Sequence, residues 1–110
     1  MSTSTTAFRS LGDADQLPDD YVNPCYLEDR KQRVAVARVD GKLYAFDDLC
    51  TCADERCPLS AGLLTGTTIM CQCHGSQFEI TTGAVLRGPA TRALGSYEVH
   101  ERDGQLQVRI

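Results

Sequence analysis

The sequence predicts an all-β fold, a small sandwich or barrel of antiparallel strands. Three observations predict it: short segments of apolar and polar alternation recur, Asp-Gly pairs separate two pairs of them, and no apolar period of 3.6 residues lasts for ten residues. A length of 110 residues suits one compact domain. We therefore expect a single domain over residues 1–110.

The first pair of strands is expected on either side of Asp40-Gly41. A run of small and β-branched residues occupies 34–39, and the apolar residues of 42–47 follow the turn. Glycine tolerates a positive φ, so Asp-Gly between two such runs is typical of a two-residue hairpin. Upstream of this hairpin, we interpret residues 12–20, which include Pro18, as a polar loop.

Further strands are expected between this hairpin and the C-terminus. Short apolar segments lie at 67–70, 77–80 and 84–86, and Thr82-Gly83 forms a turn between the last two. The C-terminal segment repeats the hairpin pattern around Asp103-Gly104, with alternating apolar residues on both sides. The chain is thus predicted to consist of short strands joined by tight turns.

Composition and charge exclude several functional classes. Eleven Lys and Arg against 15 Asp and Glu leave a net charge of −4, so the basic face of a general nucleic-acid binder is missing. Eighteen consecutive apolar residues occur nowhere, and residues 1–7 do not resemble a secretory signal, so we expect a cytoplasmic protein without a membrane span. In a reducing compartment, six cysteines favour metal binding or redox chemistry over a disulfide scaffold.

The cysteines gather in two clusters that each follow a predicted strand. The first begins with Cys50-Thr51-Cys52, and the second is Cys71-Gln72-Cys73-His74. Loops at the same end of a sheet can converge on one metal centre, and their thiolate and imidazole donors suit iron or zinc. From these residues alone, a structural zinc site and an iron–sulfur cluster are equally good interpretations.

The two clusters resemble the signature of the Rieske [2Fe–2S] proteins, Cys-x-His followed by Cys-x-x-His. Eighteen residues separate Cys52 from Cys71, and the second cluster continues as Gly75-Ser76-Gln77-Phe78. The resemblance extends from Phe8 to Ile110 and includes Gly88-Pro89-Ala90. It implies a Rieske-like antiparallel β-sandwich or barrel, a small cluster-binding lobe at about residues 48–90, and one [2Fe–2S] cluster.

One ligand position departs from the family pattern, because Cys52 stands where the family has its first histidine. Carried over by position, Cys50 and Cys71 would bind one iron, and Cys52 and His74 would bind the other. The resemblance also implies that the Ser76 hydroxyl bonds a cluster sulfur. It further places Cys57 and Cys73 near the positions of a disulfide between the two loops. Whether these two are joined or reduced stays open.

The resemblance implies a soluble one-electron carrier rather than an enzyme. A flavin-dependent or iron–sulfur reductase would supply electrons, and a terminal oxygenase would receive them through the exposed ring of His74. We expect a monomer that binds neither nucleic acid nor a membrane. Two alternatives are a Rieske-like small subunit of a nitrite reductase, and a structural zinc domain whose three cysteines and one histidine are the same four residues.

We expect Cys52→His to raise the reduction potential. A thiolate adds one negative charge to iron and a neutral imidazole adds none, so the wild-type centre accepts an electron less readily. Two-histidine Rieske centres span about −150 to +300 mV, whereas all-cysteine plant-type ferredoxins lie near roughly −400 mV. Redox titration of both proteins measures the difference, and equal potentials would contradict the expectation.

Overall fold

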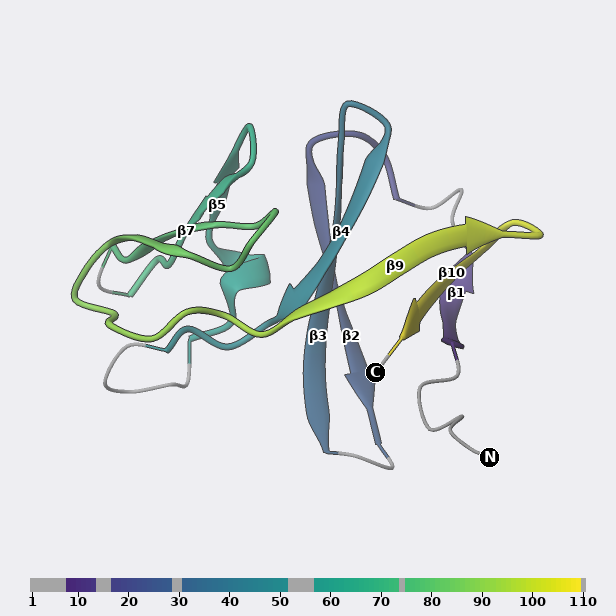
Figure 1. Cartoon of the computed structure of the whole chain (residues 1–110), viewed down its shortest axis with the longest axis horizontal. Coiled ribbons are helices and arrows are strands. Elements are labelled where there is room, and N and C mark those ends of the chain that lie inside the picture. The colour runs from purple at the N-terminus through teal and green to yellow at the C-terminus, as the bar shows by residue number, and fades with distance from the viewer. Residues whose placement is uncertain (1–7, 14–16, 29–30, 52–56, 74, 110) are drawn as a thin grey trace.

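The protein is described by a computed structural model over residues 8–13, 17–28, 31–51, 57–73 and 75–109. Two antiparallel sheets form a six-stranded body and a smaller four-stranded lobe, which lie side by side in Figure 1. The predicted all-β class is confirmed. Among the described residues, no helix is long and apolar enough to cross a membrane.

The six-stranded sheet has the strand order β1-β10-β9-β4-β3-β2. In chain order these strands are β1 (Phe8–Asp13), β2 (Tyr21–Leu27), β3 (Gln32–Val39), β4 (Lys42–Asp47), β9 (Ser96–Arg102) and β10 (Gln105–Arg109). The sheet is made of two hairpins joined where β4 pairs with β9, at Ala45↔Tyr97 and Phe46↔Ser96. Residues far apart in the sequence therefore meet at the end of β4 that leads into the lobe.

Both predicted hairpins are confirmed with their turns. Asp40 and Gly41 have φ of 52° and 79°, and Asp103 and Gly104 have 54° and 75°. Positive φ at both central residues matches the right-handed twist of the flanking strands, which explains why Asp-Gly closes each hairpin.

The central strand β3 is buried on both faces. Val34 and Val36 belong to a core inside the six-stranded body, together with Leu106 and Val108 of β10. The alternate residues, such as Ala35, belong to a second core, which the body shares with the lobe. Two-sided burial explains why this strand is a nearly continuous apolar run.

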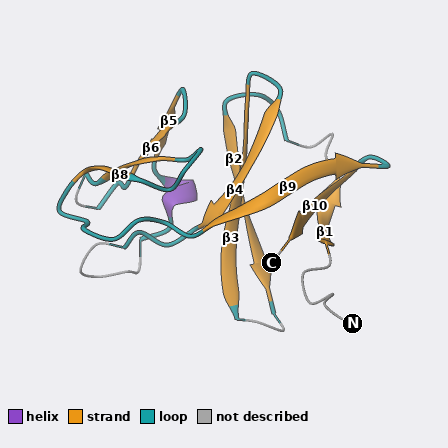
Figure 2. Ribbon diagram, viewed as in Figure 1, coloured by secondary structure: helices purple, strands orange, loops and turns teal. Residues whose placement is uncertain are grey.

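The lobe contains β5 (Leu63–Thr65), β6 (Thr68–Met70), β7 (Gln77–Glu79) and β8 (Val85–Arg87) in sequential order. A single 3₁₀ turn, Leu59–Ala61, lies between the lobe and the body and is purple in Figure 2. Ile69 and Phe78 pair across β6 and β7 and are fully buried in the shared core. The three short strands predicted in this region are confirmed, and β5 is an additional one.

Asp48, which directly follows β4, joins the body to the lobe. Its carboxylate is fully buried and accepts hydrogen bonds from the Arg33 guanidinium at 2.8 and 3.2 Å. It also accepts the backbone N–H of Ser60 at 2.7 Å and the Ser60 hydroxyl at 2.9 Å. A buried charge is tolerated when it is paired and hydrogen-bonded in this way. Through these hydrogen bonds Asp48 connects β3, the end of β4 and the 3₁₀ turn.

Two strands of the body were not predicted. The polar loop expected at 12–20 begins too early, because β1 includes Gly12 and Asp13. Strand β2 contains Pro24, and proline usually counts against a strand. Here β2 is an edge strand that pairs only with β3, and an edge strand can accommodate a residue without an N–H.

We expect Asp48→Asn to lower the free energy of unfolding by about 2–3 kcal/mol, because it removes the charged partner of a buried ion pair. This loss is smaller than the loss for a fully buried pair, because the Arg33 side chain is 38% exposed and water can hydrate its charge once Asp48 is replaced. Chemical denaturation measures the change.

Glu98→Gln is the matched control, because Glu98 pairs with Arg109 on the surface at 3.2 Å. An exposed pair of this kind contributes at most about 1 kcal/mol. If both variants lowered the free energy of unfolding equally, the Asp48 contacts would not stabilise the attachment of the lobe to the body.

Candidate metal centre

The first cysteine loop follows β4, and backbone bonds close it at its base. Leu49 forms an isolated antiparallel bridge with Pro58, and the Cys50 N–H donates to the Cys57 carbonyl at 3.0 Å. The Leu59 N–H donates to the Asp48 carbonyl at 2.7 Å just below. These bonds close the base of the loop, so Cys50 and Cys57 are held next to each other although six residues separate them.

The second cysteine loop is a tight reversal between β6 and β7. The Cys71 N–H donates to the Ser76 carbonyl at 2.8 Å, and the Gly75 N–H donates to the Cys71 carbonyl at 3.0 Å. Gly75 has a φ of 79°, a conformation that side chains rarely adopt, so glycine suits this position. The reversal places Cys71 at its buried base.

Two of the four predicted ligands are described, and the structure brings them into one core. Cys50 and Cys71 are buried, 1% and 0% exposed, and both belong to the apolar cluster shared by the body and the lobe. The other two, Cys52 and His74, lie outside the described residues. Cysteine sulfurs from two neighbouring loops are the donor chemistry that an iron–sulfur cluster requires.

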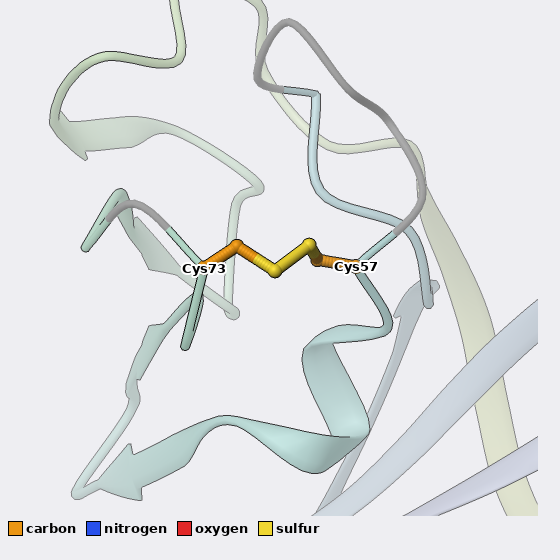
Figure 3. The surroundings of a disulfide bond; sticks show 2 residues. All are labelled: Cys57 and Cys73. Carbon is orange, nitrogen blue, oxygen red and sulfur yellow. A yellow bond between two sulfur atoms is a disulfide. The ribbon is translucent and has the colours of Figure 1, made fainter.

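A disulfide joins Cys57 to Cys73 and links the two loops (Figure 3). Their Cα atoms are 6.3 Å apart, and their sequence separation is 16. The alternative left open by the sequence is thereby decided in favour of a disulfide. Cross-linking two loops restricts their relative movement and stabilises the ligand-bearing end of the lobe.

The sequence did not indicate that Cys71 lies against this disulfide. The sulfur atoms of Cys57, Cys71 and Cys73 all lie within 4.8 Å of one another. Cys57 and Cys71 are buried, whereas Cys73 is exposed. The sequence spacing already places Cys71 and Cys73 in one loop. Cys57 joins them only because the first cysteine loop packs against the second, which the sequence does not show.

The Gly88-Pro89-Ala90 segment covers the second cysteine loop. The Ala90 N–H donates to the hydroxyl oxygen of Ser76 at 3.0 Å, and both residues are buried. Because the Ser76 oxygen acts as acceptor here, its own proton is available for another acceptor. Ser76 therefore fastens the covering segment to the loop. Phe78 belongs to the shared core.

Basic residues surround a cavity of about 330 Å³ next to Cys50. Its cationic lining residues are Lys31, Arg33 and Arg92, and Asp47 contributes an acidic group. The Thr51 hydroxyl donates to the Arg92 carbonyl at 2.6 Å, which ties the cavity wall to the first cysteine loop. The lining thus brings both basic and acidic side chains next to the start of the first cysteine loop.

Cys25 on β2 is separate from these loops. Burial raises the pKa of its thiol, the Asn23 side chain opposes this by hydrogen bonding at 3.7 Å, and the Asp48 carboxylate raises the pKa further. A higher pKa means less thiolate at neutral pH. Cys25 is therefore a poor candidate ligand.

Comparison with known proteins gives consistent matches. Residues 8–98 match the Rieske [2Fe-2S] domain. The anthranilate 1,2-dioxygenase ferredoxin subunit of Burkholderia cepacia is 30% identical over 111 residues, covering 100% of this chain and 99% of the relative. Ferredoxin CarAc of Metapseudomonas resinovorans is 39% identical over 75 residues, 68% of each chain.

A solved structure shares the fold over nearly the whole chain. It is a complex of reduced oxygenase and oxidised ferredoxin in carbazole 1,9a-dioxygenase. The match has a TM-score of 0.81 and 29% identity, and it covers 93% of this chain and 92% of the matched one. The body and lobe described above therefore form an arrangement found in that structure.

We expect Ser76→Ala to lower the free energy of unfolding by about 1–3 kcal/mol, because the buried Ala90 N–H would lose its acceptor. Ser10→Ala is the control, since its hydroxyl donates to Gln105 at an exposed position. Chemical denaturation compares the two variants. If Ser76→Ala costs no more than Ser10→Ala, the Ser76–Ala90 bond does not hold the covering segment.

Proposed function

Because the chain belongs to the family of Rieske [2Fe-2S] domains, we propose that it is a one-electron carrier that delivers electrons to a terminal oxygenase. The relatives at 30% identity or more are ferredoxin components of dioxygenase systems, and these are not catalytic subunits. The observation that carries the proposal is that two buried cysteines, Cys50 and Cys71, come from the two cysteine loops into one core cluster.

The proposed ligands are Cys50 and Cys71 for one iron and Cys52 and His74 for the other. A [2Fe–2S] cluster bound there would supply reversible acceptance of a single electron. The chemistry of the described donors fits, because both are cysteine sulfurs and both residues lie in one core cluster. Three thiolates make this site more negative than one with two histidines.

The residues around the two thiols have three separate tasks in this proposal. The apolar core and the Gly88-Pro89-Ala90 segment exclude water from the buried side. The Ser76 hydroxyl proton is free to bond a sulfur, which favours the reduced state. Lys31, Arg33 and Arg92 beside Cys50 partly offset the negative charge of the thiolates.

We propose that the second cysteine loop contacts the oxygenase and that His74 of its sequence takes part in this contact. In the matched carbazole 1,9a-dioxygenase structure, a ferredoxin is in complex with its oxygenase. The net charge of −4 suits a partner with a basic surface. A flavin-dependent or iron–sulfur reductase would supply the electrons, and the protein would act in the cytoplasm as a monomer.

The two alternatives have less support. A nitrite reductase small subunit without a cluster would not need two cysteines buried in one core at the base of the two cysteine loops. A structural zinc domain with Cys50, Cys52, Cys71 and His74 would use the same donors. The ferredoxin relatives favour iron–sulfur over zinc as the occupant.

Anaerobic purification tests the proposal. We expect a brown protein with about two iron and two acid-labile sulfide per chain, and a rhombic EPR signal after reduction. The reduced protein should be reoxidised when it is mixed with the oxygenase component of a carbazole or anthranilate dioxygenase. A colourless protein with one zinc and no sulfide would exclude the electron carrier.

Single serine variants test the ligands in the same experiment. Cys50→Ser and Cys71→Ser should lose most of the visible absorption, because hydroxyl groups replace soft thiolates poorly. Cys57→Ser and Cys73→Ser are matched controls in the same two loops, and they should retain it. Equal losses in all four variants would indicate that the loops need the disulfide in order to assemble the centre.

A further inference from the structure

The sulfur atoms of Cys57, Cys71 and Cys73 form a group that has only Cys71 in common with the proposed iron ligands. We propose that reduction of the Cys57–Cys73 disulfide by a dithiol turns this group into a binding site for Zn²⁺. The site shares Cys71 with the proposed cluster, and this part of the inference rests on the proposed function. The disulfide would thereby protect the centre from a competing metal.

The geometry of the group suits a small soft cation. Zinc binds thiolates at about 2.3 Å in a tetrahedral arrangement, which separates the sulfur atoms by roughly 3.8 Å. The Cys71 sulfur lies within 4.8 Å of the other two, so it needs to approach them by at most about 1 Å. The Cys57 and Cys73 sulfurs are bonded to each other and need to separate to this distance after reduction, which their Cα separation of 6.3 Å allows. A water molecule can occupy the fourth position.

The two loops keep these sulfurs together without the disulfide. Backbone contacts hold the base of the first loop: the Cys50 N–H donates to the Cys57 carbonyl, and Leu49 forms a bridge with Pro58. The bond from the Cys71 N–H to the Ser76 carbonyl holds the second loop. Since these are backbone bonds, cleavage of the sulfur–sulfur bond does not remove them.

The disulfide determines how many donors are available. Thiolate is the form of cysteine that binds metals, and neither sulfur of a disulfide is a thiolate. While the disulfide is intact, Cys71 alone of the three can act as a donor, and the proposed cluster uses it. Reduction adds the Cys57 and Cys73 thiols beside it, and three soft donors can then compete for zinc.

The reduction has a balanced and accessible route. One thiolate of the dithiol attacks the exposed Cys73 sulfur and releases Cys57 as a thiol. The second thiol of the reagent then closes a cyclic disulfide and releases Cys73. Two electrons and two protons pass from the dithiol to the protein. Zinc binding then displaces the thiol protons of Cys57 and Cys73 and replaces the iron that Cys71 would hold in the proposed cluster, so that iron is released.

The experiment compares holoprotein before and after treatment with dithiothreitol, with anaerobic desalting and one equivalent of zinc chloride. We expect reduced wild type to retain about one zinc per chain after a second desalting and to lose its cluster absorption. Untreated wild type should retain at least tenfold less zinc and keep its absorption. Elemental analysis and the visible spectrum provide the two readouts.

The Cys57→Ser/Cys73→Ser double variant is the matched control. It lacks the disulfide and keeps all four proposed iron ligands, so it should retain at least tenfold less zinc than reduced wild type. If the double variant does not fold, alkylation of the two released thiols of reduced wild type before zinc addition provides the same comparison.

Two results would overturn the proposal. One is equal zinc retention by reduced and untreated wild type, and the other is equal retention by reduced wild type and the double variant or alkylated protein. Absence of iron and sulfide in the protein as isolated would refute the proposed function instead. In that case the zinc comparison would still decide whether the three-thiolate site exists.

Discussion

The arrangement of the cysteine loops depends on one buried carboxylate. Asp48 is fully buried, and its oxygen atoms bind Arg33 on β3 and Ser60 in the 3₁₀ turn. Its backbone carbonyl accepts the Leu59 N–H. The lobe has a small sheet of three-residue strands, so its attachment to the larger body requires specific polar contacts in addition to apolar burial. Asp48 supplies these contacts two residues before Cys50.

Asp47, which precedes Asp48 in the sequence, links the same end of β4 to β9. The Asp47 carboxylate accepts hydrogen bonds from the Tyr97 hydroxyl, the Gln32 amide and the Gly95 N–H. Adjacent residues of a strand point to opposite faces, so one acidic pair can serve the body and the lobe at once. The strand end that carries the first cysteine loop is therefore held from both sides. A redox centre benefits from this rigidity, because ligands that move little between oxidation states transfer electrons without large reorganisation.

Much of the fold and part of the candidate site could be predicted from the sequence. Asp40-Gly41 and Asp103-Gly104 identify their hairpins, because turns of this type depend on residues that tolerate positive φ. The strand β2 was missed because Pro24 counts against a strand unless the strand is known to lie at an edge. Position at an edge is a property of the whole sheet. The alternation along β3 likewise does not reveal that both faces are covered.

The candidate donors were predicted from the sequence alone. The spacing of Cys50, Cys52, Cys71 and His74 predicts two donor-bearing loops, because local spacing sets which residues share a loop. The pairing of Cys57 with Cys73, and the position of Cys71 beside them, were decided only by the tertiary structure. These contacts depend on how two loops approach each other, and that approach is set by the buried Asp48 and the apolar core behind it.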